Sequence, residues 1–353
     1  MLISGLFCIT FGEIMLSILN VIIALLVLMV MVVIHEAGHY LVGKRLGFQI
    51  NEFSIGFGKA IFQKQLKNGE KFSIRIIPLG GYCAFEGEDE QNDNPKAFNN
   101  QKCWKRILVL FAGAFFNFLS AILIISCTFM AYGDTVPVVI DCYTDADGKV
   151  VAFDPGTSDI QVGDYIIAVD GTKLSFIQTI PGKSEGQAER QFRVRRYADD
   201  GSHTDIDVNF TIGEGVIPIQ YKTLKYGFFE AIGRGFVVNF QLVGKIFSVF
   251  IGLFTGATAT SDLGGPVTTI STLSQFAGLG LGILMYAVCL ISANLAFFNL
   301  MPIPALDGSR IVFVIIEWIR GKPVKRNVEA MIHFVGLIML FAFAIFVDVL
   351  KLF

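Results

Sequence analysis

Residues 14–39 read IMLSILNVIIALLVLMVMVVIHEAGH. The run Ile14–Ile34 carries no charge and, at about 20 residues, is long enough to cross a bilayer as a helix. Residues four apart share one face of a helix, so His35 and His39 can bind one metal ion. Glu36 lies beside them, where it can act as a base toward a water molecule. Polar groups at the end of a span are costly to desolvate, which favours a functional metal site over a chance match.

The composition is that of a polytopic membrane protein. Of 353 residues, 53% are hydrophobic and 16% charged, against about 25% charged in a soluble domain. The net charge of -2 says nothing about nucleic acid, and no basic run suggests it, so we expect no nucleic-acid partner. The six cysteines contain no CxxC pair, so neither a zinc knuckle nor a disulfide framework is indicated.

Four transmembrane helices are expected, at Ile14–Ile34, about Ile107–Tyr132, about Phe276–Phe298 and about Met331–Val347. The N-terminus lacks the basic region of a signal peptide, so we interpret it as retained. Lysines and arginines gather after the first span and between the third and fourth, which predicts that both loops are cytoplasmic. The first and third spans then end at the same membrane face.

The sequence NLMPIPALDG at Asn299–Gly308 follows the third span and therefore lies at the depth of the two histidines. Its prolines break the helix, and irregular backbone at membrane depth is tolerated where it lines a cavity. A catalytic zinc usually takes three protein ligands, and Asp307 is the carboxylate available to complete the set. The alternative is an ordinary interfacial turn, since Leu-Asp-Gly is a common turn sequence.

These two motifs, on separate spans, resemble those of the site-2 protease family of intramembrane zinc metalloproteases, in particular bacterial regulators of sigma-factor pathways that carry one PDZ domain. Three further stretches support the resemblance. They are Ile77–Tyr82, Gly113–Asn117 (with Ala114 where the family usually has proline) and Leu263–Val267.

The resemblance implies that His35, His39 and Asp307 bind Zn2+ and that Glu36 is the catalytic base. Asn294 and Asn299 occupy the family's asparagine positions and could hold an extended substrate or steady an oxyanion, because an amide both donates and accepts hydrogen bonds. An interhelical hydrogen bond is the alternative for each. Asn117 is interpreted as structural.

The segments between the spans predict β structure. Phe53–Gly58 and Lys71–Ile77 alternate as strands, with a turn expected at Gly80-Gly81. In the family this region is a membrane-associated hairpin, whose edge could pair with an extended substrate; a simple interfacial hairpin is the alternative. Residues 154–171 resemble the core of a PDZ domain, with later strands at Arg190–Tyr197 and Thr204–Ile212.

The expected fold is thus a polytopic α-helical membrane protein with about four transmembrane helices, a membrane-associated β-hairpin and an inserted extramembrane PDZ-like α+β domain. The division along the chain is 1–48 (first span with HEAGH), 49–106 (β region), 107–133 (second span), 137–213 (PDZ-like domain), 214–275 (an amphipathic or membrane-packed connection) and 276–353 (third and fourth spans). A fifth span within 226–254 would place the third-span motif at the wrong face.

The expected function is cleavage of single-span membrane proteins in the bacterial inner membrane, with the active site toward the cytoplasm and the PDZ-like domain outside. By resemblance, the substrate is an anti-sigma factor already shortened by a site-1 protease, or a remnant signal peptide. Two other classes stay open. An ion-coupled transporter should show internal repeats, which are not found; a catalytically inactive PDZ scaffold would not need intact HEAGH and Asp307.

Overall fold

The computed structural model describes residues 11–88, 93–146, 148–176, 180, 189–198, 200–211, 215–257 and 263–351. Residues 1–10, with Cys8 and the interpretation of a retained N-terminus, lie outside this part of the chain. The chain divides into two compact units, Met1–Ile124 with Leu242–Phe353, and Ile125–Gln241. Each unit is described by itself.

Seven α-helices occur in the described residues, and five of them are long and apolar enough to cross a membrane. The five are α1 (Phe11–Leu46, apolar from Met15), α2 (Cys103–Ala131), α3 (Phe228–Thr255), α5 (Leu281–Leu300) and α7 (Arg326–Leu350). The other two are α4 (Pro266–Leu279) and α6 (Asp307–Arg320), and a short 3-10 helix covers Phe98–Asn100. These helices confirm the prediction of a multi-pass membrane protein. By length and composition α3 is a fifth candidate span, beside the four that were expected.

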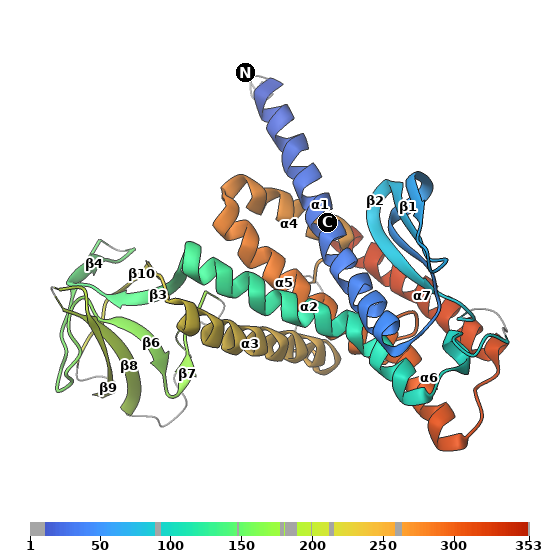
Figure 1. Cartoon of the computed structure of the whole chain (residues 1–353). Coiled ribbons are helices and arrows are strands. Elements are labelled where there is room, and N and C mark those ends of the chain that lie inside the picture. Colours follow the sequence, from blue (N-terminus) through green and yellow to red (C-terminus); the bar gives the residue numbers. More distant parts are fainter. Residues whose placement is uncertain are drawn as a thin grey trace. The chain divides into compact units, whose positions relative to one another are not determined.

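Helix α1 continues without a break from the apolar run through the HEAGH sequence and ends only at Leu46. The histidines therefore lie on a continuous helix, as their spacing requires. Farther toward the N-terminus, Ala24 and Met31 of α1 pack against Leu273 of α4 and Leu284 of α5 in one buried cluster. This cluster holds α1 and the α4–α5 pair together in the first unit (Figure 1).

The third expected span corresponds to α5, but its first residues, 276–279, belong to the separate helix α4. Gly280, with φ +115°, separates α4 from α5 in a backbone conformation that residues with a side chain rarely adopt. Pro266 begins α4 at a position where its missing N–H has no intrahelical partner to lose. The apolar content of this stretch predicted a span but did not reveal the break.

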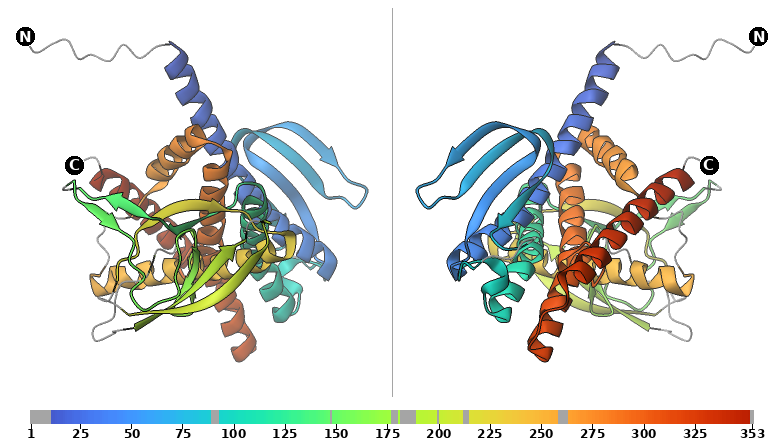
Figure 2. Two further views of the ribbon diagram at one scale, coloured as in Figure 1. Left: turned by 90° about the vertical axis from the view of Figure 1, so that its left-hand side faces the viewer. Right: turned by 90° about the vertical axis from the view of Figure 1, so that its right-hand side faces the viewer.

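Strands β1 (Ile50–Gln65) and β2 (Lys71–Phe85) confirm the expected hairpin region and are longer than predicted. The expected turn at Gly80-Gly81 is wrong, because both glycines lie within β2 and Gly81 pairs with Ile55. The chain reverses instead at residues 66–70, where Leu66 N–H donates to Glu70 O. Both views of Figure 2 show this pair projecting from the side of α1.

The base of the hairpin is fixed by an aromatic cluster. The rings of Phe48, Phe85 and Phe98 lie 5.6–5.7 Å apart, and Val109 of α2 is buried with them. Burial of large aromatic side chains supplies much of the packing free energy at such a junction. The end of β2 is thereby held between α1 and α2.

The second unit contains eight strands within its described residues: β3 (Asp134–Val139), β4 (Cys142–Thr144), β5 (Val150–Ala152), β6 (Tyr165–Val169), β7 (Thr172–Lys173), β8 (Glu189–Tyr197), β9 (His203–Thr211) and β10 (Ile219–Leu224). Six of them form one sheet in the order β10-β3-β6-β8-β9, with β7 paired to β6. Strands β4 and β5 pair separately.

The strands predicted at Arg190–Tyr197 and Thr204–Ile212 are confirmed as β8 and β9, although Ile212 lies outside the described residues. Within the stretch 154–171, a turn at Asp170-Gly171 joins β6 to β7, with Val169 paired to Thr172. The strands enclose a core that includes Ile166, Val194 and Val208. Within the described part of 134–224 every regular element is a strand.

Candidate active site

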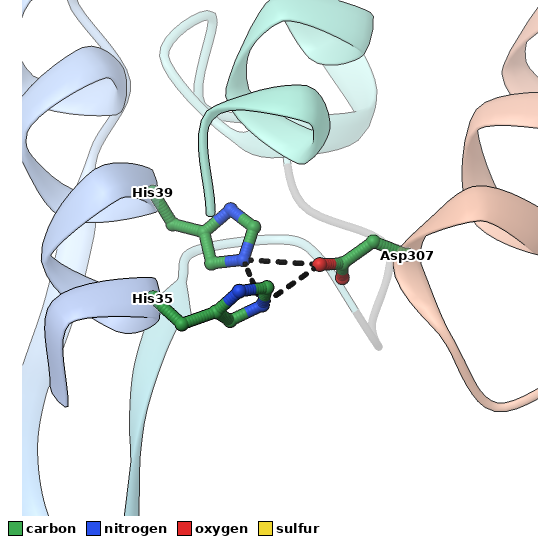
Figure 3. Close-up of side chains that lie close together, drawn as sticks. All are labelled: His35, His39 and Asp307. Carbon is green, nitrogen blue, oxygen red and sulfur yellow. Dashed lines mark hydrogen bonds and ion pairs between the residues drawn. The ribbon is translucent and has the colours of Figure 1, made fainter. Parts of the chain in front are cut away.

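Two helices bring His35, His39 and Asp307 to one point. Asp307 Oδ2 lies 2.9 Å from His35 Nε2 and 3.3 Å from His39 Nε2, and the two Nε2 atoms are 3.1 Å apart. Figure 3 shows both imidazoles extending from one helix toward the carboxylate on the opposite side. These are the three residues that the sequence proposed as metal ligands, and they form the one such cluster in the described part of the chain.

Asp307 reaches the histidines because the chain turns sharply between α5 and α6. Ala305 has φ +78°, and Asp307 is the first residue of α6. Gly308 follows it, where an added Cβ would overlap the carbonyl oxygens of Leu300 and Met301. The glycine of the Leu-Asp-Gly sequence is thus required for this close approach of the backbone to itself.

The His39 ring is oriented by the main chain of α2. Its Nδ1 lies 2.8 Å from Val109 O, so the Nδ1–H donates to that carbonyl, and Nε2 is the ring nitrogen that faces Asp307. Metal-bound histidines almost always hold their second nitrogen in this way, which sets the tautomer and the direction of the ring. Nothing in the sequence around Val109 indicates this contact, because it is made by a backbone carbonyl.

The His35 ring lies beside two asparagines. Its Nδ1 is 3.5 Å from the side-chain amides of Asn117 and Asn299. Asn117 Oδ1 is buried and has no hydrogen-bond partner among the described residues. A half-turn of an amide about its last bond exchanges the oxygen acceptor and the nitrogen donor. Turning the Asn117 amide would let Oδ1 accept from His35 Nδ1–H, which leaves Nε2 free to bind a metal.

The three asparagines considered from the sequence therefore differ. Asn299 and Asn117 both contact His35, so Asn117 has a place at the site as well as in the packing of α2. Asn294 is half-buried on α5, and no hydrogen bond joins it to His35, His39 or Asp307 in the described residues. The Gly113–Asn117 stretch was the available signal for Asn117.

Glu36 lies beside the cluster and is held by the hairpin. The backbone N–H of Cys83 in β2 donates to Glu36 Oε2 at 3.1 Å. Both border a cavity of about 320 Å³, whose wall also includes His39 and Asp307. The rest of that wall comes from Tyr82, Ala84, Phe85, Glu88, Phe98, Val109, Leu110 and Arg310. The carboxylate thus faces a space next to the three proposed ligands.

The donor set suits a divalent transition metal. Burial raises the pKa of the Asp307 carboxyl, but the two imidazoles outweigh it and hold that pKa well below its usual range. Asp307 is therefore ionised at neutral pH, as a metal ligand must be. Two imidazole nitrogens and one carboxylate oxygen are a protein ligand set that catalytic zinc takes, with a further position kept for water or substrate. The residues present fit zinc.

A two-histidine, one-carboxylate centre with a glutamate beside it, carried by helices that can cross a membrane, defines a membrane metalloprotease. The sequence profile described as Peptidase family M50 matches residues 23–343. The chain therefore belongs to peptidase family M50, the site-2 protease family, and is a zinc metalloprotease.

Bacterial relatives align over nearly the whole chain. One from Clostridium perfringens, named "Putative zinc metalloprotease CPE1693", is 30% identical over 93% of this chain and 97% of its own length. One from Brucella suis is 28% identical over 96% of both chains, and one from Fusobacterium nucleatum is 28% identical over 94% of this chain and 98% of its own. Both carry the same description as zinc metalloproteases.

Proposed function

We propose that this chain cleaves the transmembrane segments of single-span membrane proteins, with His35, His39 and Asp307 as the zinc ligands and Glu36 as the catalytic base. The observation that carries the proposal is the convergence of Asp307 from α6 on the two histidines of α1, with Glu36 facing the same cavity. Because this centre adjoins helices apolar enough to lie in a bilayer, a substrate held within the membrane can reach it.

The chain's own residues supply proton transfer and orientation. Zinc, when bound, polarises the scissile carbonyl and makes a water molecule more acidic. The Glu36 carboxylate takes the proton from the attacking water and delivers it to the leaving amine. Cys83 N–H fixes Oε2 of that carboxylate, so the base keeps its place during both transfers. Asn299, beside His35, is the better placed of the two proposed asparagines for holding substrate.

The wall of the cavity favours an unwound substrate. A helix hides its carbonyls in internal hydrogen bonds, so a transmembrane segment must open locally before it can be cut. Residues 82–85 of β2 line the cavity next to Glu36. We expect the opened segment to lie in extended form along this strand, in the manner of strand addition.

The position of the site supports a topology for the chain. His35 near the end of α1 meets Asp307 after α5, which supports α1 and α5 ending at one membrane face, and the basic loops favour the cytoplasmic face. The chain must then cross the bilayer an even number of times between α2 and α5. One crossing by α3 would need a second, and α4 has only 14 residues. We therefore propose four spans in the bacterial inner membrane.

In this topology, α3 belongs to the outer side with the sheet domain. Its early charged residues are engaged within the second unit: Arg234 pairs with the buried Asp134 at 2.8 Å, and Glu230 pairs with Arg195 at 2.7 Å. Arg234 and Glu230 form ion pairs with residues of the sheet domain, whereas a charged side chain inside lipid costs free energy. This supports a membrane-surface helix rather than a span.

We further propose that the β domain of 137–213 is PDZ-like and admits only substrates whose outer domain has been removed by a site-1 protease. The buried strand β6, with a glycine at the turn on either side (Gly163 and Gly171), supports the first part. An anti-sigma factor is the expected substrate, and a remnant signal peptide the second. A catalytically inactive scaffold or an ion-coupled transporter would leave the converged centre and its glutamate without a use.

The test is cleavage in a defined membrane. The purified zinc-loaded protein is reconstituted with a single-span substrate that lacks an outer domain, and the products are mapped by mass spectrometry. We expect one cut inside the apolar segment, on its cytoplasmic half. Cuts only in extramembrane sequence, or none with several such substrates while one zinc stays bound, would remove the intramembrane assignment.

A further inference from the structure

We propose that His333 of α7 is a positioning residue for Asp307: its imidazole holds the backbone of the turn that presents this carboxylate to the metal centre. The proposal rests on Asp307 being a zinc ligand, as proposed above. His333 lies far along the chain from HEAGH and belongs to neither metal motif, and it contacts none of His35, Glu36, His39 or Asp307 directly in the described residues.

The contact falls on the most unusual backbone position near the site. Ala305, with φ +78°, is one of two non-glycine residues with positive φ in the described chain. Such a conformation persists only where surrounding structure imposes it. The Ala305 N–H donates to His333 Nδ1 at 3.0 Å. The hydrogen bonds from Leu306 N to Ile303 O, and from Ser309 N and Oγ to Leu306 O, are by contrast local to the turn.

Packing places the turn against the same face of α7. Gly336, three residues after His333, lies under Pro304, and an added Cβ there would overlap the proline ring. On its other side the His333 ring contacts Phe313 of α6, with centroids 5.6 Å apart. Gly336 thus allows the close approach of Pro304, while His333 fixes the next residue by a directional bond.

The hydrogen bond requires one tautomer of His333. Nδ1 must carry a lone pair to accept from Ala305, so the proton of the neutral ring is on Nε2. Glu329 Oε1, one turn earlier on α7, lies 3.9 Å from Nε2, which is too far for a hydrogen bond, but its negative charge favours a proton on that nitrogen. The His333 ring thus presents an acceptor to the backbone N–H of Ala305, two residues before the proposed ligand. A half-buried histidine is often only a packing residue, but the acceptor of His333 bonds to the one strained backbone position of this turn.

The consequence concerns metal affinity. Without an acceptor at this point, Ala305 can leave the left-handed region, and the first residues of α6 move with it. A metal centre depends on how well its ligands are oriented by such partners, whose loss typically costs about 10–100-fold in affinity. His333 thereby helps hold Asp307 near the Nε2 atoms of His35 and His39 while zinc is absent.

The test compares three substitutions in the full-length protein. In His333→Asn the amide Oδ1 stands one bond from Cγ, as Nδ1 does, and can accept from Ala305. In His333→Gln the oxygen lies one atom farther out, and His333→Leu keeps apolar bulk without an acceptor. Zinc affinity is measured by chelator competition, and cobalt-loaded protein reports ligand geometry through its visible absorption.

We expect His333→Leu and His333→Gln to bind zinc about 10–100-fold more weakly with an altered cobalt spectrum, and His333→Asn to stay near wild type. Wild-type affinity and spectrum in His333→Leu, or equal losses in Asn and Gln, would overturn the proposal. If His333→Leu does not fold, the Asn and Gln pair carries the comparison. Asp307→Ala is measured in parallel: unchanged zinc affinity there would refute the ligand assignment itself rather than the role of His333.

Discussion

Gly113 of α2 determines how closely the two imidazoles can pack against the neighbouring helix. An added Cβ at this position would overlap the His39 ring and lie 2.7 Å from His35 Cε1. Protein interiors are close-packed, so neither imidazole can make room for a methyl group without moving away from Asp307. The residue types at the site follow from zinc chemistry, whereas the glycine follows from the space that two rings need.

We therefore expect Gly113→Ala to lower zinc occupancy and proteolysis by at least about tenfold while the protein still folds, because the methyl group displaces the ligand rings rather than the helix. Zinc per chain is measured by elemental analysis after purification. Gly244→Ala in α3, where an added Cβ meets nothing within 4 Å, is the matched control and should keep full occupancy. Equal occupancy in both variants would contradict this role of Gly113.

The α4–α5 pair shows how a helix can be held by a residue from elsewhere in the chain. Asp348 of α7 accepts hydrogen bonds from Val267 N at 2.9 Å and Thr268 N at 3.1 Å, and from Thr268 Oγ1 at 2.8 Å. These are donors at the first turn of α4, which lack intrahelical partners. An N-cap is usually supplied by the preceding residue, but here that residue is Gly265, which has no side chain.

Asp348→Ala should lower the free energy of unfolding by about 1 kcal/mol, the usual value of an N-cap. Unfolding is followed in mixed micelles for wild type, Asp348→Ala and Asp348→Asn. The asparagine keeps one acceptor oxygen and should recover part of the loss. A stability for Asp348→Ala equal to that of wild type would show that the cap contributes nothing.

The elements that could be predicted from sequence are those with a local pattern. The apolar runs predicted α1, α2, α5 and α7, and alternation predicted the strands β8 and β9. The extent of β1 and β2 could not be predicted, because Ile55 pairs with both Gly81 and Ile74, and such pairing is set by distant parts of the chain. The break at Gly280 is hidden for a related reason: an apolar stretch has the same composition whether it is one helix or two.

At the site, HEAGH and NLMPIPALDG sufficed to propose all three converging residues and the adjacent glutamate. Asn117 was available from the sequence but was interpreted as structural only. The contacts of Val109 O with His39 and of Cys83 N–H with Glu36 have no signature, since any residue offers a backbone carbonyl and almost any an N–H. His333 was missed because one histidine in an apolar helix carries no spacing pattern.

The arrangement of the entire chain in the membrane is tested by two of its own cysteines. Cys103 begins α2 and Cys142 lies exposed in β4. With the other four cysteines replaced, an impermeant maleimide should label Cys103 only from the cytoplasmic face and Cys142 only from the outer face, because α2 crosses between them. Labelling of both from the same face would contradict the four-span topology.

The central claim is that His35, His39 and Asp307 bind the zinc and Glu36 moves the proton, and Glu36→Gln separates these roles. The glutamine keeps the size of the side chain but cannot take a proton from water. Zinc content and cleavage are measured on one preparation of Glu36→Gln. We predict one zinc per chain, as in wild type, and cleavage of the single-span substrate reduced by at least about 1,000-fold. Substantial cleavage by the zinc-loaded variant would contradict the assignment of the base, and loss of the zinc would contradict a site built from the other three residues alone.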